Sequence, residues 1–172
     1  MEPGRMEPGK MEQEQPKNIL FLCMGNVFRS ASAEFSARKL NGSENGICFS
    51  SAGLFGKQGK QMRPDVIQSL EKRHIDPSDH HVRLLDQQIL SGADLVVSMD
   101  STIQTCLKDS FNHASVLFNA LAYGQETDIP DLWEEVPDYK DNPEAAARYI
   151  EQTIDSIYKG TPRLLSAIRG PL

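Results

Sequence analysis

The chain has 172 residues, of which 39% are hydrophobic and 24% charged, and its formal net charge is −6 at pH 7. These values are typical of one compact soluble domain. The 18 basic residues are scattered along the chain, so we expect no nucleic-acid partner, whereas a small anionic ligand would need only local positive charge. The chain shows neither a run of 18 apolar residues nor a signal-peptide pattern, so we expect a cytoplasmic protein without a membrane span.

The chain contains three cysteines, Cys23, Cys48 and Cys106, and no two of them have the C-x-x-C spacing. An odd number of cysteines without that spacing argues against both a disulfide framework and a zinc site. We therefore expect reduced thiols and no bound metal. For Cys48 and Cys106 we predict small, buried apolar residues.

The first 16 residues differ in composition from the rest of the chain. They contain the near-duplicate pentads MEPGR and MEPGK, are rich in Pro, Gly, Glu and Gln, and show no apolar periodicity. Such a segment cannot bury enough surface to fold. We predict a disordered leader at 1–16 and one folded domain at 17–172.

Apolar runs and helical spacings alternate from Asn18 onward. The continuous apolar run at 19–22 is typical of a strand that is buried on both faces of a parallel sheet. In chain order we predict a strand at 19–22, a helix from Ser30 to Asn41, a strand at 47–50, helices at 64–74 and 86–90, and a strand at 94–99. There follow a helix capped by Ser101, a short strand at 115–118, a long acidic loop at 119–142, and a closing helix that Asn142-Pro143 opens and that Gly160 and Pro162 break or kink before 164–168. This alternation implies right-handed crossovers and a three-layer α/β domain with helices on both faces of a parallel sheet.

The residues that follow the first strand have the composition of a phosphate-binding loop. Cys23 lies at the carboxyl end of that strand, where sheets of this type bind ligands. The N–H groups of 24–28 and the start of the next helix can form a nest for a tetrahedral oxyanion. Gly25 permits close approach, Asn26 tolerates a left-handed backbone, and Arg29 offers a planar fork of donors to phosphate oxygens.

The same surroundings favour a reactive cysteine. N–H groups at a helix N-terminus and an adjacent guanidinium favour the thiolate form, which is the nucleophilic form. A thiolate of Cys23 beneath a bound phosphate would attack phosphorus, and Ser30 could hydrogen-bond the sulfur and stabilise it when it leaves. The alternative is a purely structural Cys23, because the Cys-x5-Arg spacing alone is common by chance.

Several segments together resemble a known family. The stretch CMGNVFRSASAE resembles the signature of the low-molecular-weight protein tyrosine phosphatases, and FSSAGL at 49–54, DLVVSMD at 94–100 and the late acidic loop resemble its other landmarks in the same order. The early position of the cysteine fits this small family and its arsenate reductase relatives, since in larger tyrosine phosphatases the nucleophile lies late. The resemblance covers roughly residues 17–170. It implies a flavodoxin-like fold with four parallel strands in the order 2-1-3-4.

The resemblance also implies a general acid in the late loop, at Asp131 within DIPDLW. Asp128 is the nearest competitor, and an ordinary solvated carboxylate is the alternative for either. The family usually has a proline and then an aromatic residue after its acid, whereas this chain has Leu132 and Trp133. Trp133 is expected to wall the substrate pocket, and Phe55 to line its rim.

A supporting network is implied in the same way. In the family the residue equivalent to Asn26 is held in its conformation by side chains that here would be Ser30, Ser51 and His80. A surface pair is the alternative reading for His80 and His81, and two adjacent histidines are a poor metal site because they point apart in a strand. An exposed lysine is the simpler interpretation of Lys57, although this side chain could steer a phosphate.

Two residues inside the loop depart from relatives and bear on substrate and regulation. The loop consists of Met24, Gly25, Asn26, Val27, Phe28 and Arg29. Many family members carry a second cysteine where Phe28 stands, so a protective disulfide at that position is excluded. Relatives selective for phosphoarginine tend to have threonine where Val27 stands, so the apolar side chain favours phosphotyrosine.

The resemblance therefore implies a monomeric phosphatase that acts on a phosphotyrosine-containing protein or peptide. It would form a phosphocysteine intermediate on Cys23, with Asp131 as general acid and base and without a cofactor. One alternative is an arsenate reductase, for which Cys106, alone on a predicted helix, is poorly suited as a resolving cysteine. The other is a phosphate-binding homologue without catalysis.

Overall fold

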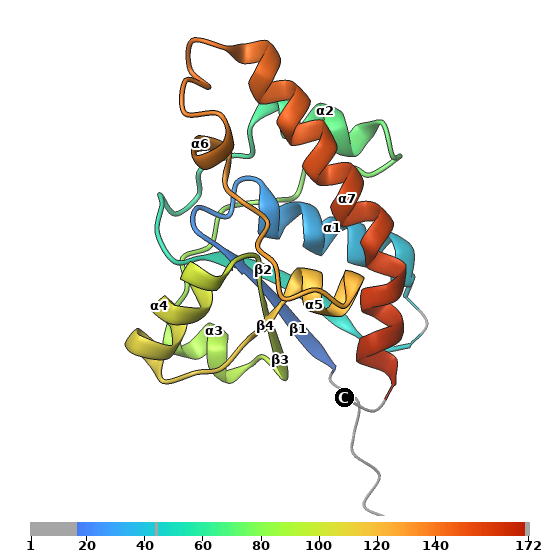
Figure 1. Ribbon diagram of the computed structural model, residues 1–172. Coiled ribbons are helices and arrows are strands. Elements are labelled where there is room, and N and C mark those ends of the chain that lie inside the picture. The colour runs from blue at the N-terminus through green and yellow to red at the C-terminus, as the bar shows by residue number, and fades with distance from the viewer. Residues whose placement is uncertain (1–16, 44, 171–172) are drawn as a thin grey trace, which may run out of the picture.

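A four-stranded parallel sheet forms the middle layer of the molecule (Figure 1). The computed structural model describes residues 17–43 and 45–170, so the disordered leader predicted at 1–16 lies outside the described residues. The strands are β1 (Asn18–Cys23), β2 (Cys48–Gly53), β3 (Leu95–Ser98) and β4 (Val116–Leu117). Their order is β2-β1-β3-β4 and every neighbouring pair is parallel. The predicted flavodoxin-like architecture is confirmed.

Strand β1 is apolar along its length because both of its faces are covered. Ile19 and Phe21 face one core cluster, and Leu20 and Leu22 face another on the opposite side of the sheet. All four side chains are at most 1% exposed. Burying each such side chain contributes about 1.5–3 kcal/mol to folding, which fixes β1 at the centre and Cys23 at the carboxyl edge.

Helices cover both faces of the sheet (Figure 1). The helices are α1 (Arg29–Asn41), α2 (Pro64–Glu71), α3 (Gln87–Ser91), α4 (Ser101–Phe111), α5 (Phe118–Tyr123), α6 (Leu132–Glu135) and α7 (Pro143–Arg169). Helices α1, α5 and α7 lie on one face, and α3 and α4 on the other. Residues of α2, α6 and α7 form a third cluster against α1. The arrangement leaves the carboxyl ends of the strands open toward α6 and the loop after β1.

The closing helix differs from its predicted form. Helix α7 continues through Gly160 and Pro162 without a break, although an internal proline costs about 3 kcal/mol in an isolated helix. Packing explains the difference, because α7 lies against α1, α2 and α5 along its length. At Gly160 the side chains of α5 pack closely on the helix, and an added Cβ would lie 2.9 Å from the Cβ of Ala122.

The stretch at 119–142 is not one continuous loop. It contains most of α5 and all of α6, which are too short to show a helical period in the sequence. Phe118 begins α5 instead of ending the fourth strand. At α4 the cap is Asp100, whose carboxylate accepts from the N–H of Ile103, so Ser101 is the first helical residue and not the cap. The other predicted elements agree with the observed bounds to within three residues.

The cysteines outside the phosphate-binding loop were predicted to be buried, and this is wrong. Cys48 is exposed and Cys106 is partly exposed. Cys48 begins β2, which is an edge strand, and so its side chain is not covered. The structure describes all three cysteines and each is free.

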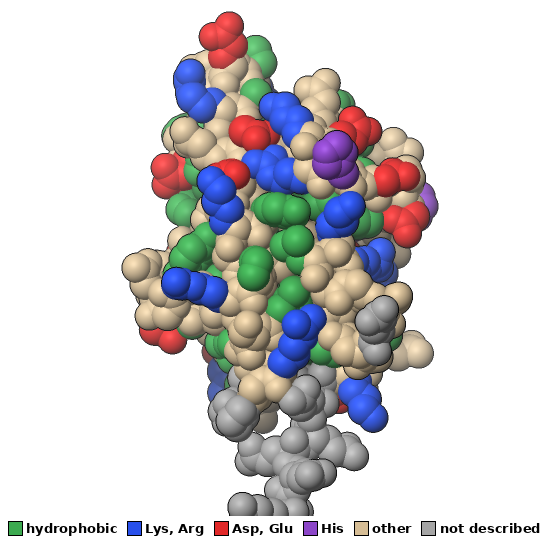
Figure 2. All heavy atoms as spheres, turned by 90° about the vertical axis from the view of Figure 1, so that its right-hand side faces the viewer, with side chains coloured by type: hydrophobic (Ala, Val, Ile, Leu, Met, Phe, Trp, Pro, Cys, Tyr) green, Lys and Arg blue, Asp and Glu red, His purple; other side chains and the backbone are tan. Residues whose placement is uncertain are grey.

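The surface carries basic side chains without a continuous basic stripe on the face seen in Figure 2, where they lie among acidic and uncharged groups. Within 17–43 and 45–170, none of the helices is sufficiently long and apolar to cross a membrane.

Candidate active site

The loop after β1 curls around the sulfur of Cys23. Asn26 has a φ of 57°, the left-handed conformation predicted for it, and its backbone N–H donates to Cys23 Sγ at 3.2 Å. The hydroxyl of Ser30 lies 3.0 Å from the same sulfur. Helix α1 begins at Arg29, so its positive end is directed toward this loop. An N–H donor, a hydroxyl group and the start of a helix therefore surround the sulfur of Cys23.

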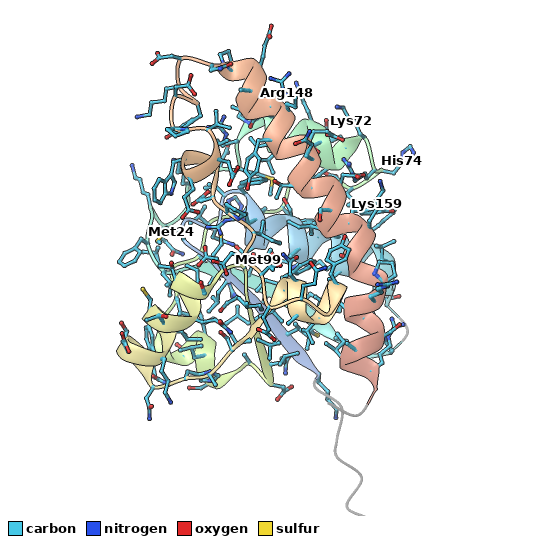
Figure 3. The ribbon with its side chains drawn as sticks, viewed as in Figure 1. Met24, Lys72, His74, Met99, Arg148 and Lys159 are labelled. Atoms are coloured by element: carbon cyan, nitrogen blue, oxygen red, sulfur yellow. The ribbon has the colours of Figure 1, made fainter. Side chains whose placement is uncertain are left out.

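Strand β2 supports the loop through a close backbone approach. The N–H of Phe55 donates to the carbonyl oxygen of Met24 at 2.8 Å, and the N–H of Leu54 donates to that of Cys23 at 3.1 Å. Figure 3 shows Met24 beyond the end of the sheet, at the same end as Met99. A Cβ at Gly53 would lie 2.9 Å from the Met24 oxygen. The pattern FSSAGL did not by itself indicate that Gly53 is needed for this close approach.

Asn26 is the centre of a buried hydrogen-bond network. Its side-chain amide donates to Ser30 Oγ at 2.9 Å and to Ser51 Oγ at 2.8 Å. Its backbone carbonyl lies 2.8 Å from Nε2 of His80, and its side-chain oxygen accepts from the N–H of Arg83. The structure brings Ser30, Ser51 and His80 together as predicted. His80 is 8% exposed, so a surface pair with the exposed His81 is the wrong interpretation of it.

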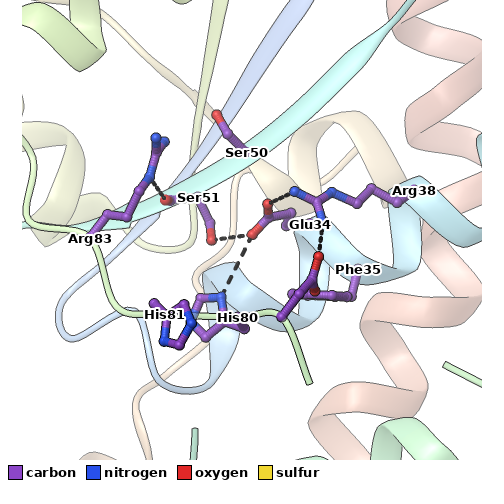
Figure 4. Close-up of a pocket in the computed structure, with 9 residues that line it drawn as sticks. Glu34, Phe35, Arg38, Ser50, Ser51, His80, His81 and Arg83 are labelled. Atoms are coloured by element: carbon purple, nitrogen blue, oxygen red, sulfur yellow. Dashed lines mark hydrogen bonds and ion pairs between the residues drawn. The ribbon is translucent and has the colours of Figure 1, made fainter. Parts of the chain in front are cut away.

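The network ends at a carboxylate that was not predicted, Glu34 (Figure 4). Ser51 donates its hydroxyl proton to Glu34 Oε2 at 2.6 Å, and Arg38 donates to Oε1 at 2.6 Å. Burial raises the pKa of Glu34, and the hydrogen bond from Ser51 and the charge of Arg38 only partly offset this effect. Glu34 lies one helical turn after Ser30, a spacing that could have placed it on the same face of α1.

Arg29 is 1% exposed and is held by two hydrogen-bond acceptors and by an ion pair with a second carboxylate. Its Nη1 donates to Asp100 Oδ2 at 2.6 Å and to the carbonyl oxygen of Ile129 at 2.7 Å. Its Nη2 lies 3.2 Å from Asp131 Oδ2. Burial alone would lower the pKa of Arg29, but the charges of Cys23, Asp131 and Asp100 raise it above its ordinary value. The guanidinium is therefore fixed in position and permanently charged.

The two candidate acids of the late loop have different surroundings. Asp128 accepts hydrogen bonds from the N–H and the hydroxyl of Ser101, each at 2.8 Å, so it stabilises the start of α4. Asp131 lies beside Arg29 and caps α6, where its Oδ1 accepts from the N–H of Leu132 at 2.8 Å. Glu134 closes the capping box by accepting from the N–H of Asp131. A proline at 132 would lack that N–H.

The remaining predicted residues differ in their exposure. Phe55 is 61% exposed and Trp133 is 56% exposed, and Lys57 is exposed as well. Phe28 is buried at 3% exposure, where its ring meets that of Tyr149 edge to face, and Val27 is partly buried. Within the described parts of the chain, no group of three or more His, Cys, Asp or Glu residues could hold a metal ion.

The sequence matches a known family over most of its length. The profile of the family described as low molecular weight phosphotyrosine protein phosphatase matches residues 18–170. The chain belongs to this family. The predicted resemblance and the predicted enzyme class, a phosphatase, are therefore confirmed.

Curated relatives include both phosphatases and arsenate reductases. The chain is 29% identical over 120 residues to the low molecular weight protein-tyrosine-phosphatase Ptp of Acinetobacter johnsonii. The aligned region covers 70% of this chain and 82% of that protein. It is 36% identical over 85 residues to arsenate reductase 2 of Staphylococcus epidermidis, and this aligned region covers 49% of this chain and 61% of that protein.

Solved structures with the same fold include other phosphatases of this type. The YwlE arginine phosphatase from Geobacillus stearothermophilus superposes with a TM-score of 0.76 at 20% identity, over 90% of this chain and 94% of that one. The low molecular weight protein tyrosine phosphatase from T. tengcongensis superposes with a TM-score of 0.61 at 28% identity, over 81% and 95%. The first of these likenesses concerns the fold alone.

Proposed function

We propose that this member of the family hydrolyses phosphotyrosine monoesters through a phosphocysteine intermediate. The observation that carries the proposal is the convergence of Cys23, Arg29 and Asp131 at the carboxyl edge of the sheet. Arg29 lies 3.2 Å from the carboxylate of Asp131 and follows the loop that curls around the sulfur. A nucleophile, a cation for the phosphoryl oxygens and an acid are the groups that this transfer needs.

In the first step the phosphate dianion binds in the loop, where N–H groups and Arg29 hold its oxygens. The thiolate of Cys23 attacks phosphorus, an S–P bond forms, and the bond from phosphorus to the tyrosine oxygen breaks. The carboxylic acid of Asp131 donates its proton to that oxygen, so tyrosine leaves in neutral form. Such proton transfer contributes about 10²–10⁴ in rate.

In the second step water hydrolyses the phosphocysteine. The carboxylate of Asp131, now without its proton, accepts one from the attacking water, whose oxygen bonds to phosphorus while the S–P bond breaks. Inorganic phosphate is released, and the hydrogen bonds of Ser30 and Asn26 stabilise the thiolate of Cys23 as it leaves. No step requires a metal ion or an organic cofactor.

We also propose that the protein acts as a monomer on phosphotyrosine-containing proteins or peptides in the cytoplasm. A catalytic thiol requires a reducing compartment, and each of the three cysteines is free. Val27 supports phosphotyrosine over phosphoarginine, because its side chain offers no hydrogen bond to a guanidinium group.

A panel of phosphotyrosine, phosphoserine and phosphoarginine peptides tests this function. The wild type should release phosphate from phosphotyrosine peptides preferentially, and Cys23→Ser should be inactive. Cys48→Ser is the matched control, since this cysteine is exposed at the start of β2, and it should keep full activity. Equal turnover by wild type and Cys23→Ser would overturn the mechanism, and preference for phosphoarginine would overturn the substrate.

Arsenate reduction is the second candidate, because the chain resembles arsenate reductase 2 over 85 residues. That reaction needs an external thiol reductant and a resolving cysteine. Cys106 is partly exposed on α4. We expect no arsenate turnover with a dithiol reductant. Turnover that Cys106→Ser abolished would favour the reductase over the phosphatase.

A further inference from the structure

The three residues before Asp131 each form a hydrogen bond to another part of the protein. The carboxylate of Asp128 accepts from Ser101, and the N–H of Ile129 donates to the carbonyl oxygen of Met99 at 2.9 Å. These bonds fix the loop on the side of α4 and β3. The side nearest α7 is fixed by a different group, the phenol of Tyr149.

Tyr149 contacts both loops of the candidate site. Its hydroxyl donates to the carbonyl oxygen of Pro130 at 2.5 Å, and Pro130 directly precedes Asp131. Its ring meets the ring of Phe28 edge to face, with centroids 6.3 Å apart and an interplanar angle of 74°. Phe28 is the residue before Arg29 in the phosphate-binding loop. Tyr149 therefore connects the loop that would hold the phosphate with the loop that would hold the acid.

The hydroxyl of Tyr149 is a donor throughout the working pH range. Burial raises the pKa of Tyr149 above its ordinary value, and the charges of Glu135 and Asp131 act in the same direction. A hydrogen bond with Thr153 and the charge of Arg29 oppose this rise without cancelling it.

The chain also has a particular need for a restraint at this point. A proline after the acid would fix φ at the first position of α6, but this chain has Leu132 there. The side chain of Leu132 is buried in the cluster that contains Phe28. Side-chain packing and the hydrogen bond from Tyr149 therefore restrict the backbone around Asp131, as a proline ring at position 132 would.

We propose that Tyr149 is a positioning residue for the general acid. Its hydroxyl holds the peptide group between Pro130 and Asp131. Its ring packs against the ring of Phe28 and so keeps the two loops at a fixed separation. A carboxyl group that is displaced by about 1 Å can lose on the order of 10² in rate. The inference rests on the proposed role of Asp131 and adds a residue on α7 to the machinery that controls proton donation.

Tyr149→Phe tests the inference by removing one oxygen. We would compare leaving-group release in the first turnover, by rapid mixing, for phenyl phosphate and 2,4-dinitrophenyl phosphate. Phenolate is a poor leaving group and requires the acid, whereas dinitrophenolate leaves without a proton. We expect about a three- to tenfold slower release of phenol, the range that corresponds to loss of one hydrogen bond, and an unchanged release of dinitrophenol. Inhibition by inorganic phosphate should stay unchanged.

Tyr123→Phe is the matched control. Tyr123 donates its hydroxyl to the carbonyl oxygen of Ser156 at 2.5 Å, so the variant loses a bond of the same kind between α5 and α7. It should leave both rates unchanged. An equal loss with both substrates in Tyr149→Phe would indicate only a structural role, and the same phenol-specific loss in Tyr123→Phe would also overturn the inference.

A double-mutant cycle separates this inference from the proposed function. In an Asp131→Asn background, Tyr149→Phe should cause no further loss with phenyl phosphate, because the group it positions is gone. Independent losses that multiply would overturn the inference while leaving Asp131 as the acid. If Asp131→Asn alone has no effect on phenol release, the proposed role of Asp131 fails and the inference fails with it.

Discussion

The carboxylate of Asp131 lies 3.2 Å from the guanidinium of Arg29, measured from Oδ2 to Nη2. The pair joins the late loop to the phosphate-binding loop, which are far apart in the sequence. It holds the proposed acid close to the loop that would bind the phosphate. Because Asp100 and Ile129 already bind Nη1, the guanidinium cannot swing away from this position without losing bonds.

The first prediction concerns which late-loop carboxylate is the acid. Asp131→Asn should lower kcat for phenyl phosphate by about 10²–10⁴, the usual contribution of general acid catalysis. Asp128→Ala should lower kcat by at most about tenfold, because its bonds to Ser101 only help to hold the loop, and it should lower the free energy of unfolding by about 1 kcal/mol. Steady-state kinetics and urea denaturation measure the two effects. A large loss of kcat in Asp128→Ala alone would reverse the assignment.

A second prediction concerns Asp100 and the binding of phosphate. Asp100→Asn keeps an acceptor for the N–H of Ile103 but removes the charge that faces Arg29. The guanidinium should then be less firmly held, and the inhibition constant of inorganic phosphate should rise by about tenfold, a charged hydrogen bond being worth about 1.5–3 kcal/mol. An unchanged inhibition constant would show that Arg29 is positioned without Asp100.

Gly53 provides a third prediction. In Gly53→Ala the new methyl group would lie 2.9 Å from the carbonyl oxygen of Met24, so the phosphate-binding loop has to move. We expect about a tenfold or larger loss of kcat/KM, because cradle and nucleophile no longer align. Gly92→Ala is the control, since its Cβ would meet its nearest neighbour at an ordinary 3.7 Å. Equal activity of the two variants would contradict the close approach.

The fourth prediction follows from the raised pKa of Glu34. The folded protein binds this proton more tightly than the unfolded chain does. The resulting stabilisation is fully present below the ordinary pKa of 4.5 and is lost as pH rises through the folded value. Relative to Glu34→Gln, which cannot titrate, wild type should therefore gain stability as pH falls from neutral toward 4.5. Urea denaturation of both proteins across this range measures the difference, and a difference that is independent of pH would contradict the assignment.

The sequence was most informative where the chemistry is local. Cys23 and Arg29 belong to one continuous loop between a strand and a helix, and the unusual backbone of Asn26 follows from its residue type. The sheet was predictable for the same reason, since buried strands are continuous apolar runs. The resemblance to the phosphatase family added the supporting residues Ser51 and His80, which lie far from the loop in sequence.

Other features depend on contacts that no local pattern records. The carboxylates of Asp100 and Glu34 reach Arg29 and Ser51 only after the strands have paired. The bond from Tyr149 to the late loop likewise requires that α7 has packed. The continuity of α7 through Pro162 is a tertiary effect as well, because burial along α1 and α5 outweighs the local cost of the proline.

Direct capture of the phosphocysteine tests the proposed mechanism most sharply. Wild type mixed with a radiolabelled phosphotyrosine peptide and quenched in alkaline detergent within the first turnovers should carry labelled phosphate on Cys23. Cys48→Ser should give the same result, and Cys23→Ala, which has no nucleophilic atom at this position, should carry no label and release no phosphate. Release of phosphate by wild type without any covalent label, or label that persists in Cys23→Ala, would contradict the mechanism.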